Sequence, residues 1–140
     1  MKAPANLSSK SLQYYVDAKH WTSDLEFFKI ETAFFHRLLD DYFIRLTSPY
    51  FIEKLKGIEA KLLKFEEVRH QTDKLLTEQI MHVELTAEDA LPEDLERIEN
   101  KQMKLGELMT TLIKDYRETK KELFDIVEKV MKDESLFNDI

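Results

Sequence analysis

Residues 95–130 read LERIENKQMKLGELMTTLIKDYRETKKELFDIVEKV, and this stretch decides the fold of the chain. Apolar residues recur in it at alternating intervals of three and four, which places their side chains along one stripe of an α-helix. A spacing of about 3.5 residues, held over about five heptads, is typical of helices that pack lengthwise in coiled-coil fashion. The stripe comprises Leu95, Ile98, Gln102, Leu105, Met109, Leu112, Tyr116, Thr119, Leu123, Ile126 and Val130.

Two earlier segments repeat this spacing. The stripe of the first comprises Tyr14, Ala18, Trp21, Leu25, Phe28, Thr32, Phe35, Leu39, Tyr42 and Leu46. The stripe of the second comprises Leu55, Ile58, Leu62, Phe65, Arg69, Thr72, Leu76, Gln79 and Val83. We therefore predict an all-α fold in which three long helices form an antiparallel bundle with coiled-coil-like heptad seams.

The breaks between the segments indicate where the helices begin and end. Ser48 and Pro49 favour a helix start, because serine caps a helix and proline at the first position lacks an N–H that would be unsatisfied. Pro92 marks the second break, and the acidic residues after it favour a start through the helix dipole. We predict helices at about 10–47, 49–85 and 92–133 in a single helical-bundle domain, 1–140, with short flexible tails.

Composition and charge argue against several classes of protein. The chain has no cysteine, so disulfides and thiolate chemistry are excluded. Its formal net charge of −7 would repel phosphate backbones, and we expect no nucleic-acid binding. The sequence has no apolar run of the ~20 residues that a membrane span needs, and its start does not resemble a secretory signal. We therefore expect a cytoplasmic protein with no membrane partner.

The first segment carries more apolar residues than one seam can bury. A second stripe runs beside the seam, and a monomeric three-helix core would leave much of it in water. Contiguous exposed apolar surface usually marks a contact site, so we expect a homodimer through the first helix, which would extend the bundle. The predicted interface residues are Phe27, Ile30, Phe34 and Leu38. Coverage by the chain's own tails is the alternative, through Leu136, Phe137 and Ile140 or through Leu7 and Leu12.

Arg69 is the one charged residue on the second seam. A buried guanidinium needs a partner, because an isolated buried charge is very costly. Glu31 lies about one turn from Phe28, the residue that the register places opposite Arg69. We predict a buried Arg69–Glu31 ion pair that fixes the register, with Glu66 as the alternative partner. Anion binding by Arg69, or an enzyme with a wet polar groove near it, are the other interpretations.

Glu67 and His70 show the Glu-x-x-His spacing that di-iron helical bundles use. Such sites need a second copy of the motif and further carboxylates, and this chain contains the motif once. The alternative function is therefore a metal-binding, di-iron-like bundle that borrows a carboxylate from another chain. His20, His36 and His82 do not share a helix face, and no nucleophile accompanies them. We predict no catalytic residues, no resident metal and no cofactor, and hence no enzyme.

The run HWTSDLEFFKIE at residues 20–31, followed by Leu38 and Leu39, contains the pattern Trp-x3-Leu-x-Phe-x3-Glu. It resembles the first helix of a set of uncharacterised helical-bundle proteins of similar size from Bacteroidetes-type bacteria. The resemblance covers mainly the first helix, and it implies a bacterial origin without a mechanism. The residues discussed above favour a non-enzymatic protein–protein interaction or scaffold module.

Overall fold

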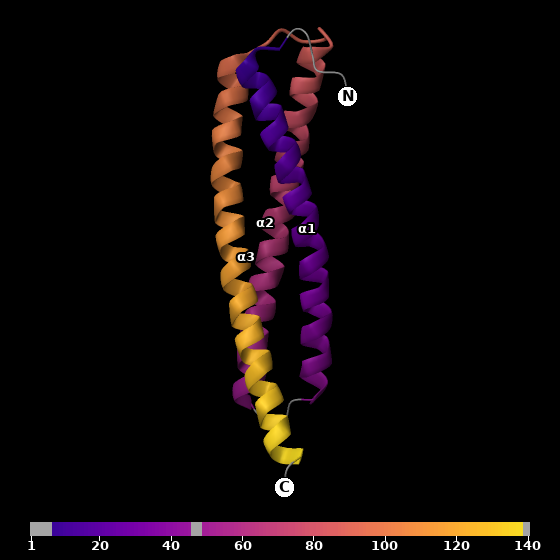
Figure 1. The fold of residues 1–140 in the computed structure, drawn as a ribbon, viewed down its shortest axis with the longest axis vertical. Helices are drawn as coiled ribbons and strands as arrows, with labels where there is room; N and C mark the ends of the chain where they lie inside the picture. The colour runs from indigo at the N-terminus through magenta and orange to yellow at the C-terminus, as the bar shows by residue number, and fades with distance from the viewer. Residues whose placement is uncertain (1–6, 46–48, 139–140) are drawn as a thin grey trace. The chain divides into compact units, whose positions relative to one another are not determined.

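Three helices make up nearly all of the described chain in the computed structural model (Figure 1). The structure describes residues 7–45 and 49–138, with side chains for 7–42 and 49–132. Helix α1 spans Ser9–Arg45, α2 spans Pro49–Ala87 and α3 spans Leu95–Asn138. The described residues contain no strand, and the helices pack against each other in a bundle, which confirms the predicted all-α three-helix fold. The antiparallel and coiled-coil details stay predictions.

The helix starts follow local capping chemistry. Helix α2 begins at Pro49, as predicted, whereas α3 begins three residues later than the predicted position 92. The reason is Asp94, whose carboxylate accepts a 3.1 Å hydrogen bond from the backbone N–H of Arg97 and so acts as the N-cap. At the other end α3 continues to Asn138, beyond the predicted 133. The predicted end of the first helix, at 47, lies outside the described residues.

The end of α2 is closed by a residue in the left-handed conformation. Asp89 has a φ of 61°. The N–H of Ala90 donates to the carbonyl of Leu85 at 2.9 Å, and the N–H of Asp89 donates to the carbonyl of Thr86 at 3.2 Å. These two bonds form a Schellman motif, in which glycine usually occupies the left-handed position. An aspartate therefore occupies here the position that glycine usually takes in this motif.

The chain forms two compact units, and each helix contributes residues to both. Unit 1 consists of Met1–Phe27 and Val68–Leu112, and unit 2 consists of Phe28–Glu67 and Ile113–Ile140. The predicted single domain stays a prediction.

Unit 1 contains a polar layer within its core. The Gln79 side-chain amide donates to the carbonyl of Ile98 at 2.9 Å and to Oε1 of Gln102 at 3.2 Å. The amide of Gln102 in turn donates to the backbone carbonyl of Tyr14 at 3.0 Å. Both glutamines are buried. Segments of all three helices are thus joined by hydrogen bonds inside unit 1.

Unit 2 has an apolar core with a ring cluster. Its buried cluster comprises Phe35, Leu39, Leu55, Ile58, Leu62, Leu123 and Ile126. The rings of Phe28, Phe35 and Phe65 lie with centroids between 4.7 and 6.2 Å from that of Tyr116. Phe35, Leu55, Leu62 and Leu123, which belong to the three stripes read from the sequence, all lie in this cluster.

The seams read from the sequence coincide with the buried residues. Every member of the second stripe, from Leu55 to Val83, is buried, including Arg69, Thr72 and Gln79. The third stripe is buried from Ile98 to Val130 except at Tyr116, which is half-buried. A period of three and four therefore predicts which side of each helix is inside, even where the residue is polar.

Candidate interaction surface

Three of the four predicted contact residues of α1, Phe27, Ile30 and Phe34, are exposed, and so is Val16 of the same helix. Ile30 is 62% exposed and Phe34 is 44% exposed, both in unit 2. Leu38, one turn after Phe34, is half-buried and packs against the core cluster of unit 2. Phe27 is 51% exposed and is the last residue of the α1 segment in unit 1. Exposed apolar side chains at successive turns of one helix are what a contact site needs.

Helix α3 adds an aromatic residue to this face of unit 2 that the sequence analysis missed. Phe124 is 44% exposed, and its ring meets Phe35 edge-on at 5.9 Å between centroids. Phe35 also contacts Phe34 at 6.0 Å. A chain of three rings therefore leads from the exposed side of α1 to the exposed side of α3. We name Ile30, Phe34, Leu38 and Phe124 the apolar face.

A polar network borders the apolar face. The hydroxyl of Tyr116 donates a 2.7 Å hydrogen bond to the Glu31 carboxylate, and the Lys120 ammonium lies 3.5 Å from the same oxygen. Lys120 also lies 5.6 Å from the ring centroids of Tyr116 and Phe124. Burial, and then the hydrogen bond and charge of Glu31, raise the pKa of the Tyr116 hydroxyl well above its usual range. The hydroxyl therefore stays protonated and holds Glu31 in place.

The predicted Arg69–Glu31 pair involves residues of different units. Arg69 is 8% exposed in unit 1. Glu31 belongs to unit 2, where Tyr116 and Lys120 bind its carboxylate. The ion pair, like the alternative pair with Glu66, stays a prediction. The contact of Glu31 with α3 was missed because the seam pattern does not say on which side each neighbouring helix lies.

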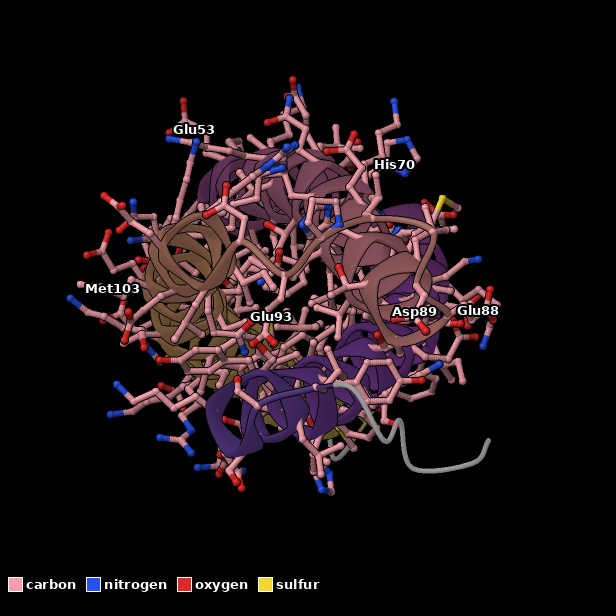
Figure 2. All side chains as sticks on the ribbon, turned by 90° about the horizontal axis from the view of Figure 1, so that it is seen from above. Glu53, His70, Glu88, Asp89, Glu93 and Met103 are labelled. Carbon is pink, nitrogen blue, oxygen red and sulfur yellow. The ribbon has the colours of Figure 1, made fainter. Side chains whose placement is uncertain are left out.

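The start of α1 is held by a carboxylate from the α2–α3 connection. Glu93 accepts a 2.8 Å hydrogen bond from the Ser11 hydroxyl and a 3.3 Å bond from the backbone N–H of Ser8. The side-chain hydrogen bonds with Ser8 and Ser11 lower the pKa of Glu93. In Figure 2, Glu93 lies between the starts of α1 and α3, whereas His70 and Met103 point outward. Glu93 thus joins segments of unit 1 that are remote in sequence.

A groove of about 490 Å³ opens between the α2 and α3 segments of unit 2. The Lys61–Glu122 ion pair, at 2.7 Å, lies in its wall. Gly57 leaves it open, since a Cβ there would meet no atom within 4 Å. The lining comprises Tyr50, Glu53, Lys54, Gly57, Ile58, Lys61, Glu122, Asp125, Ile126 and Lys129. Small-molecule sites are mostly apolar and concave, whereas this groove carries charges of both signs. Arg69, which the enzyme interpretation would need, does not line it.

The residues of the metal-binding alternative are on the surface. Glu67 and His70 are both exposed, and His70 points outward in Figure 2. Over the described residues, no group of three or more histidine, cysteine, aspartate or glutamate side chains could hold a metal ion.

Burial changes the chemistry of His82. It is half-buried in unit 1, and its Nε2 is buried without a hydrogen-bond partner among the described residues. Burial lowers the pKa of its imidazole, the charges of Arg97 and Lys101 lower it further, and Asp94 opposes them. The ring is therefore neutral at physiological pH.

None of the three helices, over the part of the chain that the structure describes, has an apolar stretch suited to crossing a lipid bilayer. No protein-family model matches the chain, and comparison with curated proteins and with solved structures gave no match. A function must therefore be argued from the chain's own residues, of which the apolar face of unit 2 is the best-formed candidate site.

Proposed function

We propose that the chain is a non-enzymatic protein–protein interaction or scaffold module, and that its contact site is the apolar face of unit 2. The observation that carries the proposal is the exposure of Ile30, Phe34 and Phe124, at 62%, 44% and 44%. Side chains of this size contribute about 1.5–3 kcal/mol each when a contact buries them fully. Leaving several of them in water next to each other is unfavourable unless a partner covers them.

The simplest partner is a second copy of the chain. Two copies related by a two-fold axis would bring the same apolar face together from both sides, as closed homodimers do. The competing cover is the chain's own tails. Leu136, Phe137 and Ile140 lie outside the residues whose side chains are described, and Leu7 and Leu12 are half-buried in unit 1. A cytoplasmic location and an origin in Bacteroidetes-type bacteria stay predictions beside this proposal.

Light scattering on the wild type and on Phe34→Glu tests the proposal. We expect the wild type to have the mass of a dimer and the variant that of a folded monomer. A carboxylate buried in an apolar contact loses its hydration, and we expect dimer affinity to fall by roughly a hundredfold. Circular dichroism should show unchanged helix content, because Phe34 is partly exposed within the chain.

Leu63→Glu is the matched control. Leu63 is 57% exposed on α2 in unit 2 and does not belong to the apolar face, so the same charge change there should leave the dimer intact. Equal loss of the dimer in both variants would show that added charge acts in general and not through this face. A wild type that stays monomeric at all concentrations would overturn self-association through it.

A further inference from the structure

The edge of α3 beside the apolar face carries an ordered series of charges. Arg117, Lys121, Phe124 and Glu128 are separated by four, three and four residues, so they share one side of the helix. All four are exposed. Along this edge the charge changes from basic to acidic, with Phe124 between.

Three other acids of the same stretch lie on a different side of α3. Glu118, Glu122 and Asp125 are spaced by four and three, and Glu122 forms its ion pair with Lys61 of α2 at 2.7 Å. The opposite side faces α1, since Lys120 reaches Glu31 there at 3.5 Å. Arg117 and Lys121 thus lie on the side of α3 that borders the apolar face, away from these three acids.

We propose that a second copy of the chain packs against this edge end for end, with Arg117 opposite Glu128 of the second copy. This dimer rests on the proposed function, and it adds the register in which the two α3 helices pack. A reversal of α3 about the midpoint between Lys121 and Phe124 places Lys121 beside Phe124 of the copy, and by the same operation it places Arg117 beside Glu128. The Arg117–Glu128 charge pair and the Lys121–Phe124 contact each form twice in the dimer, once on each side of the two-fold axis.

Charge complementarity favours this occupant. The chain carries a formal net charge of −7, so two copies repel each other over most of their surfaces. In the two-fold register this edge meets the same edge of the copy, and the attraction there comes from Arg117 and Glu128, which exchange places under the reversal. In the single chain Glu128 forms an ion pair with Lys132, one turn away at 3.2 Å, and both side chains are more than 60% exposed. Such a surface pair is weak and exchanges readily for a partner across an interface.

Charge reversal measures the register directly. Arg117→Glu and Glu128→Arg should each raise the dimer dissociation constant by about tenfold in analytical ultracentrifugation, because each places like charges opposite one another. The double variant R117E/E128R restores opposite charges across the axis and should bind within about threefold of the wild type. Lys64→Glu, an exposed α2 residue in the same unit, is the control for the change in net charge.

The outcomes separate the two proposals. If Phe34→Glu abolishes the dimer but the double charge reversal is no tighter than the single variants, the end-for-end register is wrong and the apolar face stands. If the wild type does not self-associate, both proposals fail together. Retained helix content in all variants, checked by circular dichroism, ensures that a lost dimer is not a lost fold.

Discussion

The hydroxyl of Tyr116 donates a 2.7 Å hydrogen bond to the carboxylate of Glu31, which lies 85 residues earlier in the chain. The bond joins α3 to α1 within unit 2 and shares its acceptor oxygen with Lys120. The half-buried Glu31 carboxylate thus has two partners on α3 at the border of the apolar face. The contribution of this contact to the free energy of unfolding can be measured.

Tyr116→Phe should lower the free energy of unfolding by about 1 kcal/mol, because it removes the hydroxyl while keeping the ring that packs against Phe28, Phe35 and Phe65. Urea denaturation followed by circular dichroism gives the difference. Tyr50→Phe is the control, since Tyr50 is 55% exposed and its ring contacts do not use the hydroxyl. Equal effects of the two substitutions would contradict the assignment.

Glu93→Gln should destabilise the protein at neutral pH and much less in acid. The hydrogen bonds with Ser8 and Ser11 lower the pKa of folded Glu93 below the ordinary value of 4.5. A lowered folded pKa means that the stabilisation is fully present above pH 4.5 and is lost as the pH falls through the folded pKa. Melting temperatures of wild type and variant should therefore converge as the pH falls below 4.5 and through the folded pKa of Glu93.

Glu96→Gln provides the comparison for that experiment, because Glu96 is an exposed carboxylate in the first turn of α3. If the melting temperature of Glu93→Gln differs from that of the wild type by the same amount at neutral and acid pH, the charged Glu93 carboxylate does not stabilise the start of α1.

Asp89→Gly should stabilise the protein by about 1 kcal/mol. Asp89 holds a φ of 61°, a conformation that costs an L-residue roughly 1–2 kcal/mol and glycine almost nothing. The measurement is thermal or urea unfolding. Ala90→Gly, at the next position, should give no gain, because only Asp89 among the described non-glycine residues has a positive φ. A destabilised Asp89→Gly would show that the aspartate side chain matters more than the backbone strain.

Gly57→Ala and Gly106→Ala should each stabilise the protein by about 1 kcal/mol, the difference in helix propensity between the two residues. A Cβ at Gly57 meets nothing within 4 Å, and one at Gly106 lies 3.6 Å from the Trp21 ring, an ordinary contact. Both changes are therefore free of clashes. Loss of stability in either variant, measured by urea unfolding, would mean that the helix needs close backbone approach at that point.

The sequence predicted the inside of each helix better than the contacts between helices. The alternation of three and four placed Leu62, Thr72 and Gln79 in the interior, and all three are buried. It could not place Glu31 beside Tyr116 or expose Phe124 next to Phe35, because these positions flank the seam. Which flank meets which helix depends on the direction in which the chain winds round its core, and the same heptads fit both directions.

Local chemistry accounts for the remaining differences. Pro49 was found as a helix start because proline has a strong preference for the first helical position. Asp94 was not singled out as the N-cap, because other acidic residues such as Glu93 and Glu96 lie beside it. Asp89 was missed as the left-handed residue of a helix end, since glycine is the usual signal. The exposure of Ile30 and Phe34 agrees with the reasoning that selected them, and their partner awaits the mass measurements.

The bond between Gln79 and Gln102 also limits how the helices of unit 1 can misalign. A displacement of α3 by one heptad in either direction would still set apolar residues against the α2 seam, with Leu95 or Met109 in the place of Gln102. In each shifted state both glutamine amides would lose their mutual hydrogen bond in a dry interior, at about 1–3 kcal/mol for each unsatisfied group. The two glutamines thus favour one register of α3 against α2. The registers shifted by seven residues, which the repeating apolar residues alone would also allow, lack this hydrogen bond.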